Sequence, residues 1–177
     1  MKIKTDRNVQ YHLISQPDES DKRRRPIIFL HGMTLSGKDW QSVISRLTPT
    51  YWSIAPDLIG HGRTDAPDQS ELYQIEAVIE QLVSVMDTLE IETADWVGYS
   101  MGGRILFHFA RSYPDRVQSM VVESSTAGLE GTERRAQRRC ADEELARYIK
   151  NHSLEEFVKR WSNAPIFDTQ QSVSQSK

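Results

Sequence analysis

Apolar residues fall along this chain in two alternating patterns, which predict strands and helices in turn. Short continuous apolar runs are typical of strands buried on both faces, and they occupy residues 26–30, 51–55, 94–99 and 117–122. Between them, apolar positions recur at the spacing of a helix that buries one stripe, at 37–47, 71–89 and 101–112. An N-terminal hairpin is expected from Ile3 to Ile14. This alternation predicts an α/β fold, a mostly parallel sheet with helices on both faces.

A serine stands at the junction between the strand at 94–99 and the helix that follows it. The segment Gly98-Tyr99-Ser100-Met101-Gly102 fits the pattern G-x-S-x-G. In a nucleophile elbow this pattern places the serine on a sharp strand-to-helix turn with its hydroxyl exposed, and the glycines let the backbone reverse closely around it. We interpret Ser100 as the reactive residue of an α/β-hydrolase-type site.

Two backbone N–H groups are candidates for an oxyanion hole. His31-Gly32-Met33 ends the first buried strand. In this architecture one donor follows the nucleophile, and the other lies in the loop after that strand. We therefore expect the N–H groups of Met33 and Met101 to be the donors. The alternative is that Gly32 only supplies a tight turn.

The loop after the next strand carries Asp57 and His61 on a tight, glycine-rich segment ahead of the serine. At such a position an aspartate commonly accepts hydrogen bonds from nearby backbone N–H groups. We interpret both residues as scaffold and not as members of a catalytic triad.

The histidine and carboxylate that a reactive serine needs are not evident. In this architecture they follow the serine along the chain, the acid first. After Ser100 the sequence offers only His108, two turns into the following helix, and His152, between two helical segments. We therefore expect these 177 residues to be the N-terminal part of a longer enzyme, in which the missing C-terminal strands carry the catalytic aspartate and histidine.

The pattern changes after residue 123, where two helical segments follow each other with no strand between them, at 132–150 and 153–161. The second begins with a capping-box signature, Ser153 followed by Glu156. Two helices inserted after a sheet strand suggest a lid over the site, the usual place for substrate recognition. We divide the chain into residues 1–123, the N-terminal part of the core, and 124–177, the start of a truncated helical lid.

Arg104 lies four residues after Ser100, so both side chains project from one helix face a turn apart. A cation there would suit an anionic substrate. The alternative, an ordinary exposed arginine, is equally compatible with the sequence.

The first lid helix carries an arginine cluster, Arg134, Arg135, Arg138 and Arg139. Asp142 and Glu143 lie four residues beyond the last two of these, a spacing typical of salt bridges on a solvated helix. A cluster at the mouth of a site would also attract a polycarboxylate. On the second lid helix, Trp161 either anchors the lid or forms a wall of the pocket.

Composition excludes several classes of function. The net charge of −3 implies no general affinity for nucleic acid or acidic membranes, and the run from Lys22 to Arg25 is interpreted as a solvated loop. The single cysteine, Cys140, fits a reducing compartment. There is no apolar stretch long enough to span a membrane and no signal peptide, so we expect a cytoplasmic protein. We expect a small-molecule substrate and neither a metal ion nor a cofactor.

Four segments together resemble one group of α/β-hydrolases, the 2-succinyl-6-hydroxy-2,4-cyclohexadiene-1-carboxylate (SHCHC) synthases of menaquinone biosynthesis. The segments are Phe29 to Gly32, Asp57 to Gly62, Gly98 to Arg104, and the lid text from Glu123 to Phe167. The first two occur across many α/β-hydrolases. Gly98 to Arg104, which reads G-Y-S-M-G-G-R, is more selective because of its arginine.

The resemblance implies an enzyme that removes a proton from a polycarboxylate substrate and expels pyruvate, leaving a cyclohexadiene. It implies that Ser100 acts as a base and forms no acyl-enzyme. By motif position it makes Tyr99, Arg104, Arg138 and Trp161 substrate-binding residues, with Arg138 one position away from the alternative Arg139. The other interpretations are a carboxylesterase-type hydrolase and an inactive truncated product.

Overall fold

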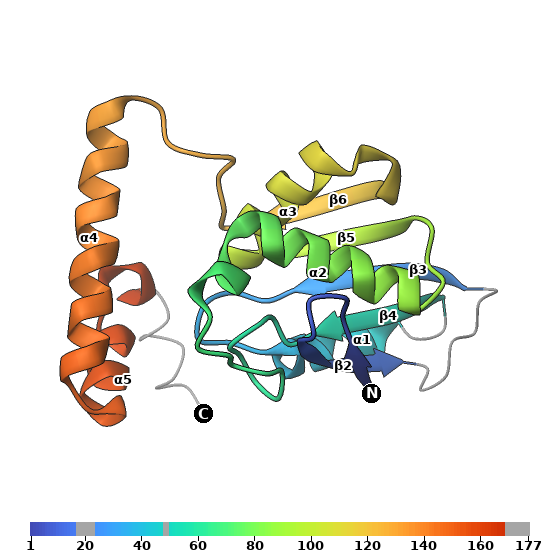
Figure 1. Cartoon of the computed structure of the whole chain (residues 1–177), viewed down its shortest axis with the longest axis horizontal. Helices are drawn as coiled ribbons and strands as arrows, with labels where there is room; N and C mark the ends of the chain where they lie inside the picture. The colour runs from blue at the N-terminus through green and yellow to red at the C-terminus, as the bar shows by residue number, and fades with distance from the viewer. Residues whose placement is uncertain (17–23, 48–49, 169–177) are drawn as a thin grey trace. The chain divides into compact units, whose positions relative to one another are not determined.

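The computed structural model describes residues 1–16, 24–47 and 50–168. Its core is a six-stranded sheet (Figure 1), which runs in the order β1 (Lys2–Lys4), β2 (Gln10–Gln16), β4 (Tyr51–Pro56), β3 (Arg25–Leu30), β5 (Ala94–Tyr99) and β6 (Val117–Glu123). The first two strands form the expected hairpin, and β2 pairs antiparallel with β4. From β4 to β6 every pairing is parallel. The predicted α/β architecture is confirmed.

The predicted helices are present, with two differences at their starts, and two short 3₁₀ turns at 114–116 and 165–167 are additional. They are η1 (Gly37–Trp40), α1 (Gln41–Leu47), η2 (Ser70–Tyr73), α2 (Ile75–Thr88), α3 (Met101–Ser112), η3 (Pro114–Arg116), α4 (Thr132–Asn151), α5 (Leu154–Ser162) and η4 (Pro165–Phe167). The segment predicted at 37–47 begins with a 3₁₀ turn. The segment predicted at 71–89 is divided at Gln74, whose extended backbone, with ψ 147°, cannot continue a helix.

The two faces of the sheet bury separate apolar clusters. The larger cluster includes Trp96 of β5, Leu82 and Met86 of α2, and Phe109 of α3. The smaller one joins Phe29 of β3 to Ile44 of α1. Figure 1 shows α2 and α3 side by side over one face. Helices on both faces leave the carboxyl ends of the parallel strands open, and sites of this architecture form there.

The chain forms two compact units, Met1–Gly128 and Leu129–Lys177. The division between 123 and 124 drawn from the sequence stays a prediction. Within the second unit, α4 and α5 are joined by a stack in which the Arg160 guanidinium lies 4.3 Å from the centre of the Tyr148 ring, and His152 stacks on the same residue at 3.8 Å. The capping box at Ser153 is confirmed, and the hydrogen bonds from the Ser153 backbone and hydroxyl lower the pKa of Glu156.

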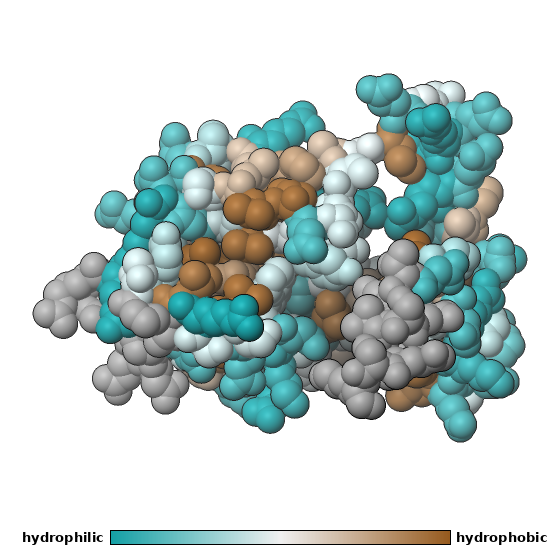
Figure 2. Space-filling model, turned by 180° about the vertical axis from the view of Figure 1, so that it is seen from behind, coloured by the Kyte–Doolittle hydropathy of each residue, from teal (hydrophilic) through white to brown (hydrophobic). Residues whose placement is uncertain are grey.

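The strand β6 leaves apolar side chains uncovered among the described residues. Val121 is 60% exposed and Met120 40% exposed. Val121 pairs in register with Val97 of β5, which packs against the smaller cluster, so Val121 lies on that same face of the sheet. Figure 2, seen from behind, shows apolar side chains gathered on that side of the first unit. Apolar patches of this kind mark surfaces that contact other protein segments.

Candidate functional site at the strand-to-helix elbow

Ser100 occupies the single residue between β5 and α3, and its backbone is strained. Its φ of 51° and ψ of −111° lie outside the regions that side-chain-bearing residues favour. Two hydrogen bonds hold it there: its N–H donates to the Glu123 carbonyl of β6, at 2.9 Å, and its carbonyl accepts from the Arg104 N–H, at 3.1 Å. Strain maintained by the surrounding sheet and helix is typical of a functional turn.

The elbow is possible because glycines let the helix approach the sheet closely. A Cβ on Gly102 would lie 2.3 Å from the Leu30 carbonyl oxygen, and one on Gly98 would lie 2.7 Å from the Gly103 Cα. Real Cβ atoms do not approach backbone atoms so closely. The glycines of the motif are therefore required by packing on both sides of Ser100.

Gly102→Ala is expected to lower the free energy of unfolding by about 3 kcal/mol, at the upper end for overpacking, because the obstacle is backbone. Urea unfolding followed by circular dichroism measures the change. Arg111→Ala, at an exposed position of the same helix, is the control and should stay within about 0.5 kcal/mol of wild type. Equal stability of the two variants would show that the elbow tolerates a side chain at 102.

The loop after β3 lies against the elbow. A Cβ on Gly32 would stand 2.9 Å from the Tyr99 ring and 3.4 Å from the Ser100 Cβ. Neither the Met33 N–H nor the Met101 N–H has an acceptor among the described residues. The Met101 N–H is one of the N–H groups that the first turn of a helix leaves free. The two predicted oxyanion donors are thus free to bind a ligand, and their assignment stays a prediction.

Asp57 accepts hydrogen bonds from several parts of the fold, as predicted. Its carboxylate is buried and accepts from the Gly37 N–H at 2.7 Å, the Arg63 N–H at 2.9 Å and the ring of His12 at 3.0 Å. His61 contacts the Ile59 carbonyl of the same loop through Nδ1. These bonds tie the loop after β4 to η1 and β2, which fits the interpretation of Asp57 and His61 as scaffold.

Arg104 is exposed on α3, one turn beyond Ser100, and has no ion-pair partner in the part of the chain that the structure describes. His108, one turn further along the helix, is also exposed. No hydrogen bond joins the Ser100 hydroxyl to a histidine within residues 1–16, 24–47 and 50–168. The described residues therefore supply the serine and a free cation but no base for the serine.

The lid residues are placed within the second unit alone. The single Nε–H of Arg138 is shared between the two oxygens of the Asp142 carboxylate, at 2.8 and 2.9 Å, the i,i+4 pairing expected from the spacing. Trp161 stacks on Phe157, with ring centres 6.0 Å apart, and meets Phe167 edge-on at 5.8 Å. These contacts place Trp161 in an aromatic cluster within the second unit. The roles of Arg138 and Trp161 in binding stay predictions.

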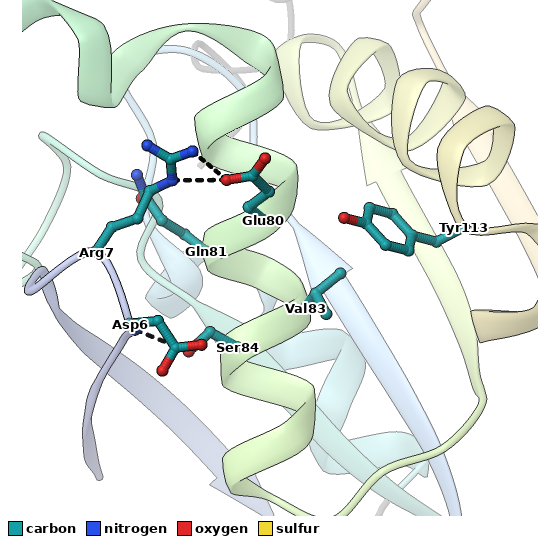
Figure 3. Close-up of a pocket in the computed structure, with 7 residues that line it drawn as sticks. All are labelled: Asp6, Arg7, Glu80, Gln81, Val83, Ser84 and Tyr113. Atoms are coloured by element: carbon teal, nitrogen blue, oxygen red, sulfur yellow. Dashed lines mark hydrogen bonds and ion pairs between the residues drawn. The ribbon is translucent and has the colours of Figure 1, made fainter.

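A pocket of about 220 Å³ lies away from the elbow, between the turn after β1, α2 and the end of α3 (Figure 3). Arg7 and Glu80 form an ion pair there, and the Asp6 N–H donates to the Ser84 hydroxyl at 3.0 Å. The Arg7–Glu80 ion pair and the Asp6–Ser84 hydrogen bond therefore attach the turn after β1 to α2.

Neither a metal site nor a membrane span is found in the described residues. No group of three or more metal-ligating side chains comes together there. No helix there is both long enough and apolar enough to cross a membrane. Of the basic run near the N-terminus, Lys22 and Arg23 lie outside the described residues, and Arg25 forms an ion pair with Asp95.

Comparison with known proteins agrees with this geometry. The profile of the α/β hydrolase fold family matches residues 25–170. The chain is similar to a Bacillus subtilis (strain 168) protein named as a 2-succinyl-6-hydroxy-2,4-cyclohexadiene-1-carboxylate synthase, with 36% identity over 89% of this chain and 57% of that protein. The synthase of the same name from Serratia proteamaculans (strain 568) is 31% identical over 87% of this chain and 58% of its own length.

Among solved structures, a variant of a meta-cleavage product hydrolase superposes with a TM-score of 0.61 and 30% identity, over 71% of this chain and 45% of that one. The chain spans little more than half the length of the curated relatives it matches. The residues matched by the family profile, 25–170, contain the serine elbow, the loop after β3 and both α-helices of the second unit.

Proposed function

Because this chain belongs to the α/β hydrolase fold family, we propose that the whole protein is an enzyme acting through Ser100, and that it is a SHCHC synthase. The observation that carries the proposal is Arg104, an exposed cation without a partner in the described chain, one helical turn from a strained serine. A site for a neutral ester has no need of such a cation, whereas a substrate with several carboxylates does.

The chemistry follows from the resemblance and the geometry together. Ser100 removes a proton from the substrate, and the bond to the leaving group breaks as pyruvate departs. Negative charge develops on oxygen in such a step, and the N–H groups of Met33 and Met101 would bind it. Arg104 and Arg138 would bind substrate carboxylates, beside Tyr99 and Trp161. We propose that the base that accepts the serine proton lies in a segment of the whole protein that corresponds to the part of the relatives this chain does not cover.

The proposal includes a small polycarboxylate as the partner and a cytoplasmic location. The location rests on the sequence alone.

The second candidate is a carboxylesterase-type hydrolase. It is favoured by the elbow itself, which is the nucleophile turn of lipases and esterases, and by the 30% identity to a meta-cleavage product hydrolase. In that case Ser100 would be a nucleophile and would carry an acyl group during turnover. In a synthase it would stay unmodified.

Intact-protein mass spectrometry of the whole protein separates the two candidates. With p-nitrophenyl acetate, an esterase would accumulate an acetyl group on Ser100 in the burst phase and release nitrophenol rapidly. The proposal predicts no acylation during pyruvate release from the synthase substrate. Rapid ester turnover with an acylated Ser100 and no pyruvate would establish the hydrolase instead, and inertness in both reactions would indicate an inactive product.

A further inference from the structure

His31 is fully buried, directly after β3, between the loop that follows β3 and the loop that follows β4. The sequence marked it only as the end of a strand. In the structure both of its ring nitrogens are engaged with backbone: Nε2 is 2.9 Å from the Leu58 nitrogen, and Nδ1 is 2.8 Å from the Gly32 carbonyl oxygen.

These two contacts determine where the ring carries its proton. A backbone N–H can only donate, so Nε2 must accept from Leu58 and is unprotonated. The single proton of the neutral ring is then on Nδ1 and is donated to the Gly32 carbonyl. Burial lowers the pKa of His31, and His61 nearby adds to that effect against the opposing influence of the Gly32 carbonyl, Asp57 and Asp39. The neutral ring is therefore the form that the fold selects.

The Gly32 carbonyl belongs to the same peptide unit as the Met33 N–H. In a planar trans peptide these two groups point in opposite directions. A ring that holds the carbonyl on one side therefore aims the N–H to the other. The Leu35 N–H donates to the same carbonyl at 3.2 Å, so the oxygen is held by two donors. Gly32 in turn lies against Tyr99 and Ser100.

We propose that His31 is a positioning residue, which orients the Gly32–Met33 peptide so that the Met33 N–H points at the oxyanion formed beside Ser100. Its bond to Leu58 anchors the ring to the neighbouring loop, so the peptide is held relative to the sheet and not only to its own turn. This inference rests on the proposed use of Ser100 and of the Met33 N–H, and it applies to either of the two candidate reactions.

Two substitutions separate this role from simple packing. The side-chain amide of His31→Asn places a donor near the position of Nδ1, which preserves the bond to the Gly32 carbonyl. The longer side chain of His31→Gln reaches the position of Nε2 and preserves the acceptor for Leu58. We expect kcat of the whole protein to fall about 100-fold in His31→Gln, because a catalytic group misplaced by about 1 Å loses that much. His31→Asn should retain at least ten times more activity than His31→Gln, with KM unchanged in both.

His61→Gln is the matched control. His61 lies beside His31, with ring centres 5.0 Å apart, but within the described residues its ring hydrogen-bonds to the Ile59 carbonyl of its own loop and not to the Gly32–Met33 peptide. Its kcat should equal that of wild type. Urea unfolding of all three variants measures stability separately. If kcat of the two His31 variants follows their stability, or if His31→Gln is the more active, the positioning role is wrong.

Nitrogen-15 NMR gives a second readout that needs no turnover. In the chain of residues 1–177, His31 should show a proton on Nδ1 and none on Nε2. The Met33 amide signal should move in His31→Gln and stay in His31→Asn. A proton on Nε2, or a Met33 signal that is the same in both variants, would overturn the inference while leaving the proposed function untouched. Conversely, ester cleavage without pyruvate release would remove the proposed function, and kcat for the ester would still test His31.

Discussion

Ser100→Gly is expected to produce a protein that is inactive and more stable than wild type. Glycine adopts a positive φ without the clash that Cβ causes, so the strain at the elbow is relieved. Strain of this kind costs about 1–3 kcal/mol. Glycine offsets part of this gain because it loses more conformational entropy on folding than serine does. The free energy of unfolding should therefore rise by about 1 kcal/mol. Pyruvate release should fall by at least about 1,000-fold, as for other essential serines.

Ser100→Ala is the matched variant, because it removes the hydroxyl and keeps the Cβ. Its activity should fall as far as that of Ser100→Gly, while its stability stays close to wild type. Urea unfolding and the pyruvate assay on the whole protein give both quantities. A glycine variant less stable than the alanine variant would show that the backbone at Ser100 is not strained. Unchanged activity in either variant would remove Ser100 from the reaction.

Arg104→Ala is expected to lower kcat/KM for the polycarboxylate substrate. The loss of transition-state stabilisation should be about 2–5 kcal/mol, the cost of removing one partner of a charge pair in a site. Stability should not change, because the guanidinium is exposed and makes no ion pair within the described residues. Steady-state kinetics of pyruvate release measure the effect. Arg104→Lys should recover part of the loss, because it restores the charge but not the planar fork.

Arg111→Ala is the control for Arg104, since it removes an exposed arginine from the far end of the same helix. Its kinetics should match wild type. If Arg104→Ala has normal kinetic constants, Arg104 is an ordinary surface residue, and the argument for a polycarboxylate substrate loses its main support.

The fold follows from local patterns to a large extent. β5 and α3 have the predicted bounds, Ala94–Tyr99 and Met101–Ser112, because Ser100 between them and the glycines on either side of it allow only a tight reversal. The break at Gln74 was not predicted, because neither glycine nor proline marks it in the sequence. The exposed apolar face of β6 was not predicted either, since burial depends on which segments cover a strand and not on its own residues.

The local geometry of the candidate site was predictable where its residues are close in sequence. Ser100 and Arg104 share one helix face, and the pairing of Arg138 with Asp142 follows from an i,i+4 spacing. The role of His31 was missed because its partner Leu58 lies 27 residues away, on a loop brought near only by the parallel pairing of β3 and β4. The signal that could have found it is a histidine at the end of a buried apolar strand, where a polar ring needs partners for both nitrogens.

We propose that the whole protein eliminates pyruvate from its substrate through Ser100. The most direct test measures pyruvate, with a coupled lactate dehydrogenase assay, and the conjugated diene, by its ultraviolet absorbance, in one reaction of the whole protein. We expect equal amounts of the two products at every time point and neither product with Ser100→Ala. Absence of pyruvate, or equal rates with Ser100→Ala, would contradict it.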